Sequence, residues 1–445
     1  MTDTRSIYSD RCWWDGKLQP ATVVCEKGII AEIFPYKTID AMDMRNAVLM
    51  PGVIDAHVHI NEPGRTHWEG FATATKAAAA GGITTIVDMP LNASPVTTTV
   101  DAFNRKKEAA TDQLYVNVAF YGGLIPGNLN DLDDLINEGV VGIKCFLVHS
   151  GIDEFPNVGE EEIDKAMPVI AKHGVPLLAH CEIYKEEAEC ELSRYPGRYK
   201  EYLASRPKKW ENDAIDLMIR LCRKHNCPTH IVHVSSAEAL VSIANAKAEG
   251  LPLTAETCAH YIYFNAEQIQ DRNTLFKCAP PIREASNNLL LKEALETGVL
   301  DFLATDHSPA PPEVKQVETG NFQTGWGGIA GLQFLLTASW TALRETMPLE
   351  KFIPLLTEHP AKFLKLNDRK GKIQVGFDAD LVVWKPEDKE IVKESSVLHR
   401  HKISPYIGEE LYGCIKQTIV GGIPVYNNNG IIDEEIKNGK IILNN

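Results

Sequence analysis

The sequence predicts an α/β fold: a (β/α)8 barrel of the TIM type with a small β-sandwich domain that both ends of the chain build together. Three patterns support this prediction. Short strands and turns fill the first 50 residues, a repeat of strand, loop and helix runs from Pro51 to about residue 365, and strands and turns then return. A chain of 445 residues has room for a barrel and a smaller second unit.

The small domain is expected to take strands from both chain ends. Near the start, residues 13–17 are typical of a hairpin, and residues 22–25 and 29–33 of strands. Near the end, residues 371–384 and 417–426 show the same pattern. The expected limits are residues 1–50 and 366–445 for the two parts of this domain, and residues 51–365 for the barrel.

The barrel segment contains apolar runs that suit buried parallel strands, separated by helical periodicity. We expect strands at residues 51–60, 84–89, 116–122, 142–147, 176–181, 229–234, 253–258 and 301–305. The expected helices include residues 68–80, 101–110, 160–173, 212–225, 236–249 and 331–344. This alternation favours a closed barrel. A doubly wound open sheet is the alternative, with less support because no Gly-rich phosphate motif follows the first strand.

The composition is that of a globular enzyme and argues against nucleic acid or membrane as a partner. Hydrophobic residues make up 44% of the chain, charged residues 24%, and the formal net charge is −15. Nucleic acids and anionic membranes bind basic patches, which we do not find. No apolar run approaches the ~20 residues of a membrane span. Ten cysteines without a C-x-x-C pair predict reduced thiols and a cytoplasmic location.

Side chains that can bind a metal ion recur at the ends of the expected strands. His57 and His59 are two residues apart on the first strand, so their rings lie on the same face. His180 ends the fifth strand, His233 lies on the sixth, and Asp306 follows the eighth. Carboxyl ends of barrel strands meet at one face, so we expect these side chains to converge. Each alone also has an ordinary interpretation, as a hydrogen-bonded core histidine or a capping aspartate.

Lys144 lies in the apolar run 140–146 of the fourth expected strand. Burying its ammonium without a carboxylate beside it is costly. Desolvation is therefore expected to lower its pKa and to free a neutral amine for chemistry.

Taken in order, residues 55–59, Lys144, His180, His233 and Asp306 resemble the binuclear metal site of the amidohydrolase superfamily. The resemblance implies that Lys144 is carboxylated to N6-carboxylysine and bridges two divalent ions, usually Zn²⁺. It implies that His57 and His59 bind one ion together with Asp306, and that His180 and His233 bind the other. Asp306 would also move the proton during catalysis, and the assembly would be a homotetramer.

Longer motifs resemble the cyclic-amidase branch of that superfamily, and within it the allantoinases most. They are residues 61–70, 88–92, 142–147, 278–283, 306–309, 325–329 and 401–406. This resemblance implies hydrolysis of the cyclic amide bond of allantoin to allantoate, in purine and ureide degradation. Dihydroorotases place an arginine two residues after the second histidine, where its fork holds a carboxylate. Asn61 stands at that position here, which favours a cyclic ureide without a carboxylate.

Other functions remain open. A hydantoinase or dihydropyrimidinase would use the same metal site on another cyclic ureide. So would a dihydroorotase in which Arg65 or another cation replaces the missing arginine. A non-catalytic barrel that acts as an interaction scaffold is expected to lose ligands, and none is missing here. The candidate substrate-binding residues are Asn61, Asn92, His149, Cys278 and Gly325.

Overall fold

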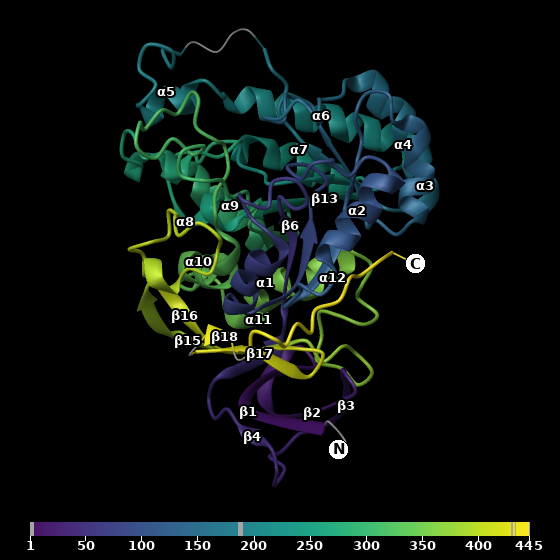
Figure 1. Cartoon of the computed structure of the whole chain (residues 1–445), viewed down its shortest axis with the longest axis vertical. Helices are drawn as coiled ribbons and strands as arrows, with labels where there is room; N and C mark the ends of the chain where they lie inside the picture. Colours follow the sequence, from purple (N-terminus) through teal and green to yellow (C-terminus); the bar gives the residue numbers. More distant parts are fainter. Residues whose placement is uncertain (1–3, 186–189, 429, 432, 445) are drawn as a thin grey trace.

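The computed structural model describes residues 4–185, 190–428, 430, 431 and 433–444, and its larger part is a barrel of parallel strands surrounded by helices (Figure 1). The barrel strands are β6 (Val53–Val58), β7 (Ile83–Asp88), β8 (Asn117–Phe120), β9 (Gly122–Gly123), β10 (Ile143–Phe146), β11 (Leu177–His180), β12 (Thr229–Ile231), β13 (Leu253–Cys258) and β14 (Phe302–Ala304). Each overlaps a segment in which the sequence predicts a strand. The predicted fold class is confirmed.

The barrel closes through two arcs of parallel strands. β6, β7 and β8 pair in order, and β9 to β14 pair in order. The chain passes directly from β8 to β9, which joins the arcs on one side. On the other side, Val58 forms a parallel bridge with His307, and the amide of His59 donates to the carbonyl of His307 at 2.8 Å. This contact places the loop after β14 beside the end of β6.

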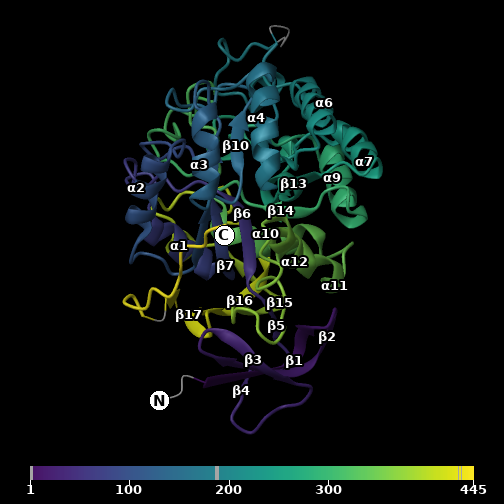
Figure 2. The ribbon, with the colours of Figure 1, turned by 90° about the vertical axis from the view of Figure 1, so that its right-hand side faces the viewer.

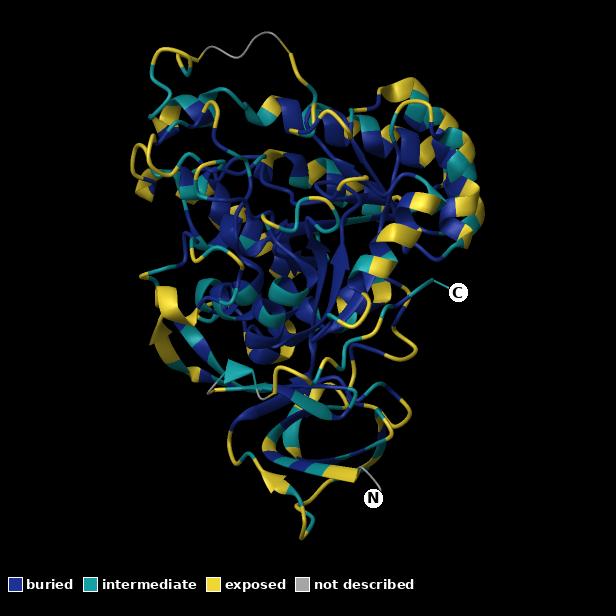
Figure 3. Cartoon of the chain, in the orientation of Figure 1, coloured by how far each residue is buried: buried dark blue, intermediate teal, exposed yellow. Residues whose placement is uncertain are grey.

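Helices cover the outside of the barrel, with buried residues on their inner faces (Figure 3). α4 (Glu160–His173) shows the reason, because its buried Ile163, Met167 and Ile170 recur at helical spacing. The other helices are α1 (Phe71–Ala80), α2 (Val100–Ala110), α3 (Leu132–Asn137), α5 (Tyr199–Ala204), α6 (Lys208–His225), α7 (Leu240–Ala248), α8 (Ala259–Tyr263), α9 (Ala285–Thr297), α10 (Leu335–Leu343), α11 (Leu349–Phe352) and α12 (Glu358–Phe363). Short 3-10 turns are η1 (Leu129–Asp131), η2 (Ala237–Ala239), η3 (Ala266–Gln268), η4 (Thr274–Phe276), η5 (Leu332–Phe334), η6 (Ile353–Leu356) and η7 (Glu394–Ser396).

Both ends of the chain meet in one mixed sheet, because β5 pairs with β1 on one side and with β15 on the other. Its strands are β1 (Thr4–Trp14), β2 (Lys17–Glu26), β3 (Ile29–Phe34), β4 (Met42–Asp43), β5 (Val48–Pro51), β15 (Leu381–Ile391), β16 (Glu410–Val420), β17 (Ile423–Asn427) and β18 (Gly430–Ile431). The predicted hairpin is present: Trp14 pairs with Lys17 across Asp15 and Gly16, which both have positive φ.

Alternation along β15 attaches this sheet to the barrel. Val382 and Trp384 pack in the barrel core, whereas Leu381 and Val383 point into a separate core of the small domain. β5 continues through Gly52 into β6, so the small domain lies at the start of that barrel strand (Figure 2). The carboxyl ends of the barrel strands are therefore left to the loops.

Two expectations from composition concern helices and cysteines. Within the part of the chain that the structure describes, no helix has the length and hydrophobicity needed to cross a membrane. The cysteines are free thiols and most are buried, as expected for reduced side chains.

Candidate metal centre and substrate cavity

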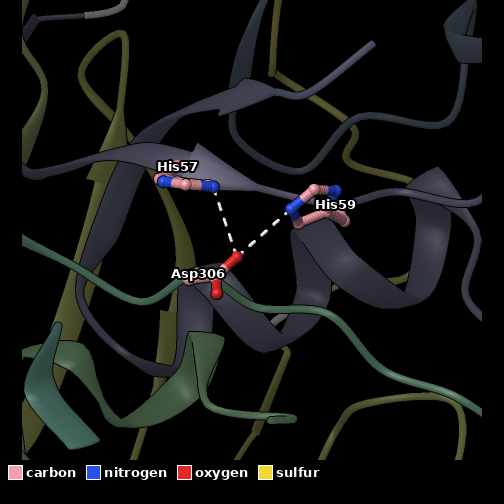
Figure 4. A group of neighbouring side chains, drawn as sticks. All are labelled: His57, His59 and Asp306. Atoms are coloured by element: carbon pink, nitrogen blue, oxygen red, sulfur yellow. Dashed lines mark hydrogen bonds and ion pairs between the residues drawn. The ribbon is translucent and has the colours of Figure 1, made fainter. Parts of the chain in front are cut away.

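The end of β6 and the loop after β14 bring three candidate ligands together. His57 and His59 point the same way from the strand end, as their spacing predicts. Oδ1 of Asp306 lies 3.2 Å from Nε2 of His57 and 3.2 Å from Nε2 of His59 (Figure 4). The potential ligand atoms of the three residues lie within 4.8 Å of one another, and all three side chains are buried. Two imidazoles and a carboxylate in this arrangement suit a zinc-like ion.

Glu256, in β13, holds the other side of the His57 ring. Its Oε1 lies 2.5 Å from Nδ1 of His57, and its Oε2 lies 3.2 Å from Nε2 of His230. Burial alone would lower the pKa of His57, but the carboxylates of Asp306 and Glu256 outweigh burial and raise this pKa to about 9. The point where His57, His59 and Asp306 converge therefore attracts positive charge, as a cation site must.

His180 and His233 lie beside this cluster. Their ring centroids are 4.6 Å apart, and the ring of His233 is 5.4 Å from that of His57. The ring of Phe146 stacks on that of His180 with 4.6 Å between the centroids, and Oε2 of Glu182 lies 2.8 Å from Nε2 of His180. Burial lowers the pKa of both histidines well below the usual value, which keeps the rings neutral and able to bind a metal. Nδ1 of His233 has no hydrogen-bond partner among the described residues.

Lys144 is fully buried in β10. Its Nζ donates to the carbonyl of Cys145 at 3.3 Å and lies 4.2 Å from the centre of the Phe146 ring, and it forms no ion pair with a described residue. Burial lowers its pKa to about 8, as the sequence predicts. The ring of Phe146 contacts both Lys144 and His180, and β10 pairs with β11, so the two side chains are neighbours.

Three non-glycine residues at this face have left-handed backbones. The φ angles are 41° at His233, 46° at Asp306 and 71° at Asn92. Such conformations cost about 1–3 kcal/mol each and persist where the surroundings hold them in place. The chain accepts this strain at the positions that aim side chains at one another.

One cavity of about 550 Å³ opens over the candidate ligands. His57, His59, His180, His233 and Asp306 line it, and Lys144 does not. Of the residues predicted to bind substrate, Asn92, His149 and Gly325 also line the cavity. Most of the predicted site residues therefore lie around one cavity, as their places at the strand ends imply.

Asn61 and Cys278 are not among the cavity-lining residues. Asn61 is buried, and its Nδ2 donates to the carbonyl of Pro309 at 3.3 Å. Cys278 is buried as well, and its carbonyl accepts a hydrogen bond from the Tyr202 hydroxyl at 2.7 Å. Asn61 was predicted from its place two residues after the second histidine, where dihydroorotases have an arginine, and Cys278 from its place before a turn. Both side chains instead lie in packed surroundings.

Arg65 does not supply a cation to the cavity. Its guanidinium donates to the carbonyl of Asn92 at 3.2 Å and pairs with Glu154 at 2.5 Å. Two cations that sequence reasoning missed do line the cavity, Arg206 and Lys277. Asn61 by itself therefore does not exclude a substrate carboxylate, because positive charge reaches the cavity from elsewhere.

Sequence reasoning also missed two buried carboxylates that contact the histidines. Glu256 is the charged residue of an otherwise uncharged buried strand, which is the same signal that singles out Lys144. Glu182 follows His180 by two residues and forms an ion pair with Arg206 at 3.4 Å. Arg206 carries no comparable signal, because it lies in a polar stretch whose position depends on the tertiary fold.

A barrel with such a buried cluster at the carboxyl ends of its strands is the architecture of a metal-dependent hydrolase. Residues 48–439 match the model of the amidohydrolase family, and the chain belongs to this metal-dependent family. The resemblance inferred from the sequence is thereby confirmed.

Two proteins named allantoinase align with most of the chain. The allantoinase of Streptomyces avermitilis is 43% identical over 410 residues, which cover 91% of each chain. The allantoinase of Saccharomyces cerevisiae is 41% identical over 96% of each chain. Among solved structures, the L-hydantoinase (dihydropyrimidinase) from Arthrobacter aurescens covers all of both chains with a TM-score of 0.92 and 30% identity.

Proposed function

We propose that this chain hydrolyses the cyclic amide bond of allantoin to give allantoate, a step in purine and ureide degradation. The observation that carries this proposal is the similarity to two proteins named allantoinase over at least 91% of each chain. The cavity supports it, because a buried cluster of side chains that could bind a metal lines a space large enough for a small ureide.

The proposed site holds two divalent metal ions, for which Zn²⁺ suits the histidine and carboxylate donors. His57, His59 and Asp306 would hold one ion, His180 and His233 the other, and a carboxylated Lys144 would bridge them. The donor chemistry supports this assignment, since the histidines are buried and the lysine is predisposed to lose its proton. When bound, such ions lower the pKa of water and polarise a carbonyl oxygen.

Asp306 is the proposed proton carrier. Burial alone would raise its pKa, but His57 and the neighbouring rings hold the pKa well below the usual value, so the carboxylate is ionised. It can then accept a proton from the attacking water and deliver it to the departing ring nitrogen. Ala279 and Gly327 also line the cavity, and their backbone N–H groups have no acceptor among the described residues. They are available to carbonyl groups of the ureide.

The test is ring opening of allantoin, hydantoin, dihydrouracil and dihydroorotate by enzyme prepared with zinc and bicarbonate, side by side. Preference for allantoin is the expected result. Preference for hydantoin or dihydrouracil would instead support a hydantoinase, the second candidate, which the structural likeness to L-hydantoinase favours. Activity on dihydroorotate would assign a carboxylate-binding role to Arg206 or Lys277. Inactivity on all four, with less than one metal ion per chain, would favour the scaffold.

Three further expectations stay predictions. The resemblance implies a homotetramer, which light scattering would test. The reduced thiols expected from the sequence suit a cytoplasmic location, which fractionation would test. Division of the chain at residues 1–50, 51–365 and 366–445 would be tested by limited proteolysis.

A further inference from the structure

One side of the cavity is built from a segment without regular secondary structure. Residues 323–327, here called the loop wall, line the same cavity as His57, His59 and Asp306. They belong to the connection between β14 and η5, in which the structure describes turns and the bridges of His307 with Val58 and Ile329. The shape of the loop wall must therefore come from contacts other than strand pairing.

Lys315 lies at the centre of these contacts. Its side chain is buried, with 4% of the residue surface exposed. Its Nζ donates to the carbonyls of Lys277 at 2.7 Å and Trp326 at 3.0 Å, and also to that of Gly328. An ammonium has three N–H donors, so these three carbonyls satisfy it completely.

Lys277 extends the same arrangement. Its Nζ donates to the carbonyls of Gln323 and Gly325 in the loop wall. Its own carbonyl accepts from the amide of Gly328 at 2.9 Å as well as from Lys315. The two lysines thus bind carbonyls on both sides of Trp326 and hold the loop wall against the Lys277 segment.

Neither lysine forms an ion pair with a described residue, although both are buried. A buried ammonium without a carboxylate is costly, and a neutral side chain would fill the same space at lower cost. Burial lowers the pKa of Lys315 to about 7, while its three carbonyl acceptors favour the charged form. What a neutral side chain could not provide is a single donor group that binds three backbone carbonyls at once.

We propose that Lys315 is a positioning residue that sets the shape of the loop wall and thereby the affinity of the site for the substituent on the substrate ring. The inference rests on the proposed function. The reacting ring carbonyl must lie at the cluster of His57, His59 and Asp306. The ureido substituent of allantoin then extends into the rest of the cavity, to which the loop wall contributes.

The test compares Lys315→Met, Lys315→Gln and the wild-type enzyme, with Lys292→Met as control. Lys292 is a half-buried lysine of α9 that does not line the cavity. We expect Lys315→Met to raise KM for allantoin about tenfold and KM for unsubstituted hydantoin less than about twofold, with kcat little changed. Lys315→Gln keeps two N–H donors and should fall between Met and wild type. Lys292→Met should match wild type.

Hydrogen exchange gives a readout that needs no substrate. The amides of Gly325, Trp326 and Gly328 are hydrogen-bonded to Asn321, Val314 and Lys277, so they should be protected in the wild type. Lys315→Met should accelerate exchange in residues 320–328 and leave peptides of β6 unchanged, with Lys315→Gln again intermediate.

Unchanged exchange, an equal rise of KM for both substrates, or equal behaviour of the Gln and Met variants would each overturn the proposal. If the Met variant does not fold, the Gln variant carries the test. If the wild type does not open allantoin, the proposed function fails, but exchange still tests the loop wall. KM is then compared on hydantoins with and without a ring substituent.

Discussion

The two sides of the cavity are built on different principles. On the ligand side, Lys144 and His180 lie on β10 and β11, which pair in register. His57 lies on β6, at an irregularity in the pairing of β6 with β7. On the loop wall, Gln323 and Thr324 are exposed, and the backbone is held by lysine ammonium groups. Groups that do chemistry need precise placement on rigid elements, whereas a loop can change its contacts without altering the barrel. The difference suggests that chemistry and substrate choice can be separated by mutation.

The largest effect is expected from the ligand side, at Lys144. Lys144→Ala removes the group proposed to bridge two ions, so activity should fall about 10⁴-fold or more and both metals should be lost. Metal analysis and turnover of allantoin measure this. A short-chain carboxylic acid should restore part of the activity by taking the place of the carboxylated amine.

Lys292→Ala is the matched control for Lys144→Ala, because it removes a lysine of α9 away from the cavity. Wild-type activity and metal content in Lys144→Ala would rule out the bridging role of Lys144. The proposed division between a side for chemistry and a side for substrate choice would then lose its main support.

The ligand side was predictable from the sequence because its geometry follows from strand periodicity. Strands end at one face, so His57, His180 and Asp306 had to approach one another once the barrel was inferred. α9 was missed because Leu289, Leu290 and Leu291 are consecutive and define no single face, and the first two are exposed.

The loop wall was only partly predictable, for a physical reason. Gly325 was expected at the cavity, and it does line the cavity. Lys277 and Lys315 are far apart in sequence and meet through carbonyl acceptors, which every residue carries. No side-chain pattern marks such a contact. Asn61 shows the opposite case. Its place two residues after His59 suggested a substrate contact, but its side chain is buried and donates to the carbonyl of Pro309.

Asp306 should show the next largest effect. Asp306→Asn keeps the shape of the side chain but cannot carry the proton, so kcat should fall about a thousandfold. The matched control is Asp301→Asn next to the other end of β14, where Asp301 pairs with Lys247 at 2.6 Å. A kcat for Asp306→Asn within a few-fold of the control would assign proton transfer to another residue.

A smaller effect is expected at Glu256, which contacts the proposed metal ligand His57. Glu256→Gln removes the charge that holds Nδ1 of His57, so the metal dissociation constant should rise about 10–100-fold. Excess zinc should restore most of the activity. Titration of metal-free enzyme, followed by turnover at saturating zinc, separates the two effects. Unchanged metal affinity would mean that the barrel positions His57 without help from Glu256.

The smallest effect is expected at the rim, where His149 lines the cavity and its side chain is 58% exposed. Its contact with Asp153, at 3.3 Å, lies in solvent and contributes little. His149→Ala should therefore change KM for allantoin by less than about threefold and leave kcat unchanged. If KM rises a hundredfold instead, the side chain of His149 at the rim contributes directly to substrate binding. Backbone positioning by Lys315 would then not be the main source of substituent affinity, and the contrast between the two sides of the cavity would have to be redrawn around His149.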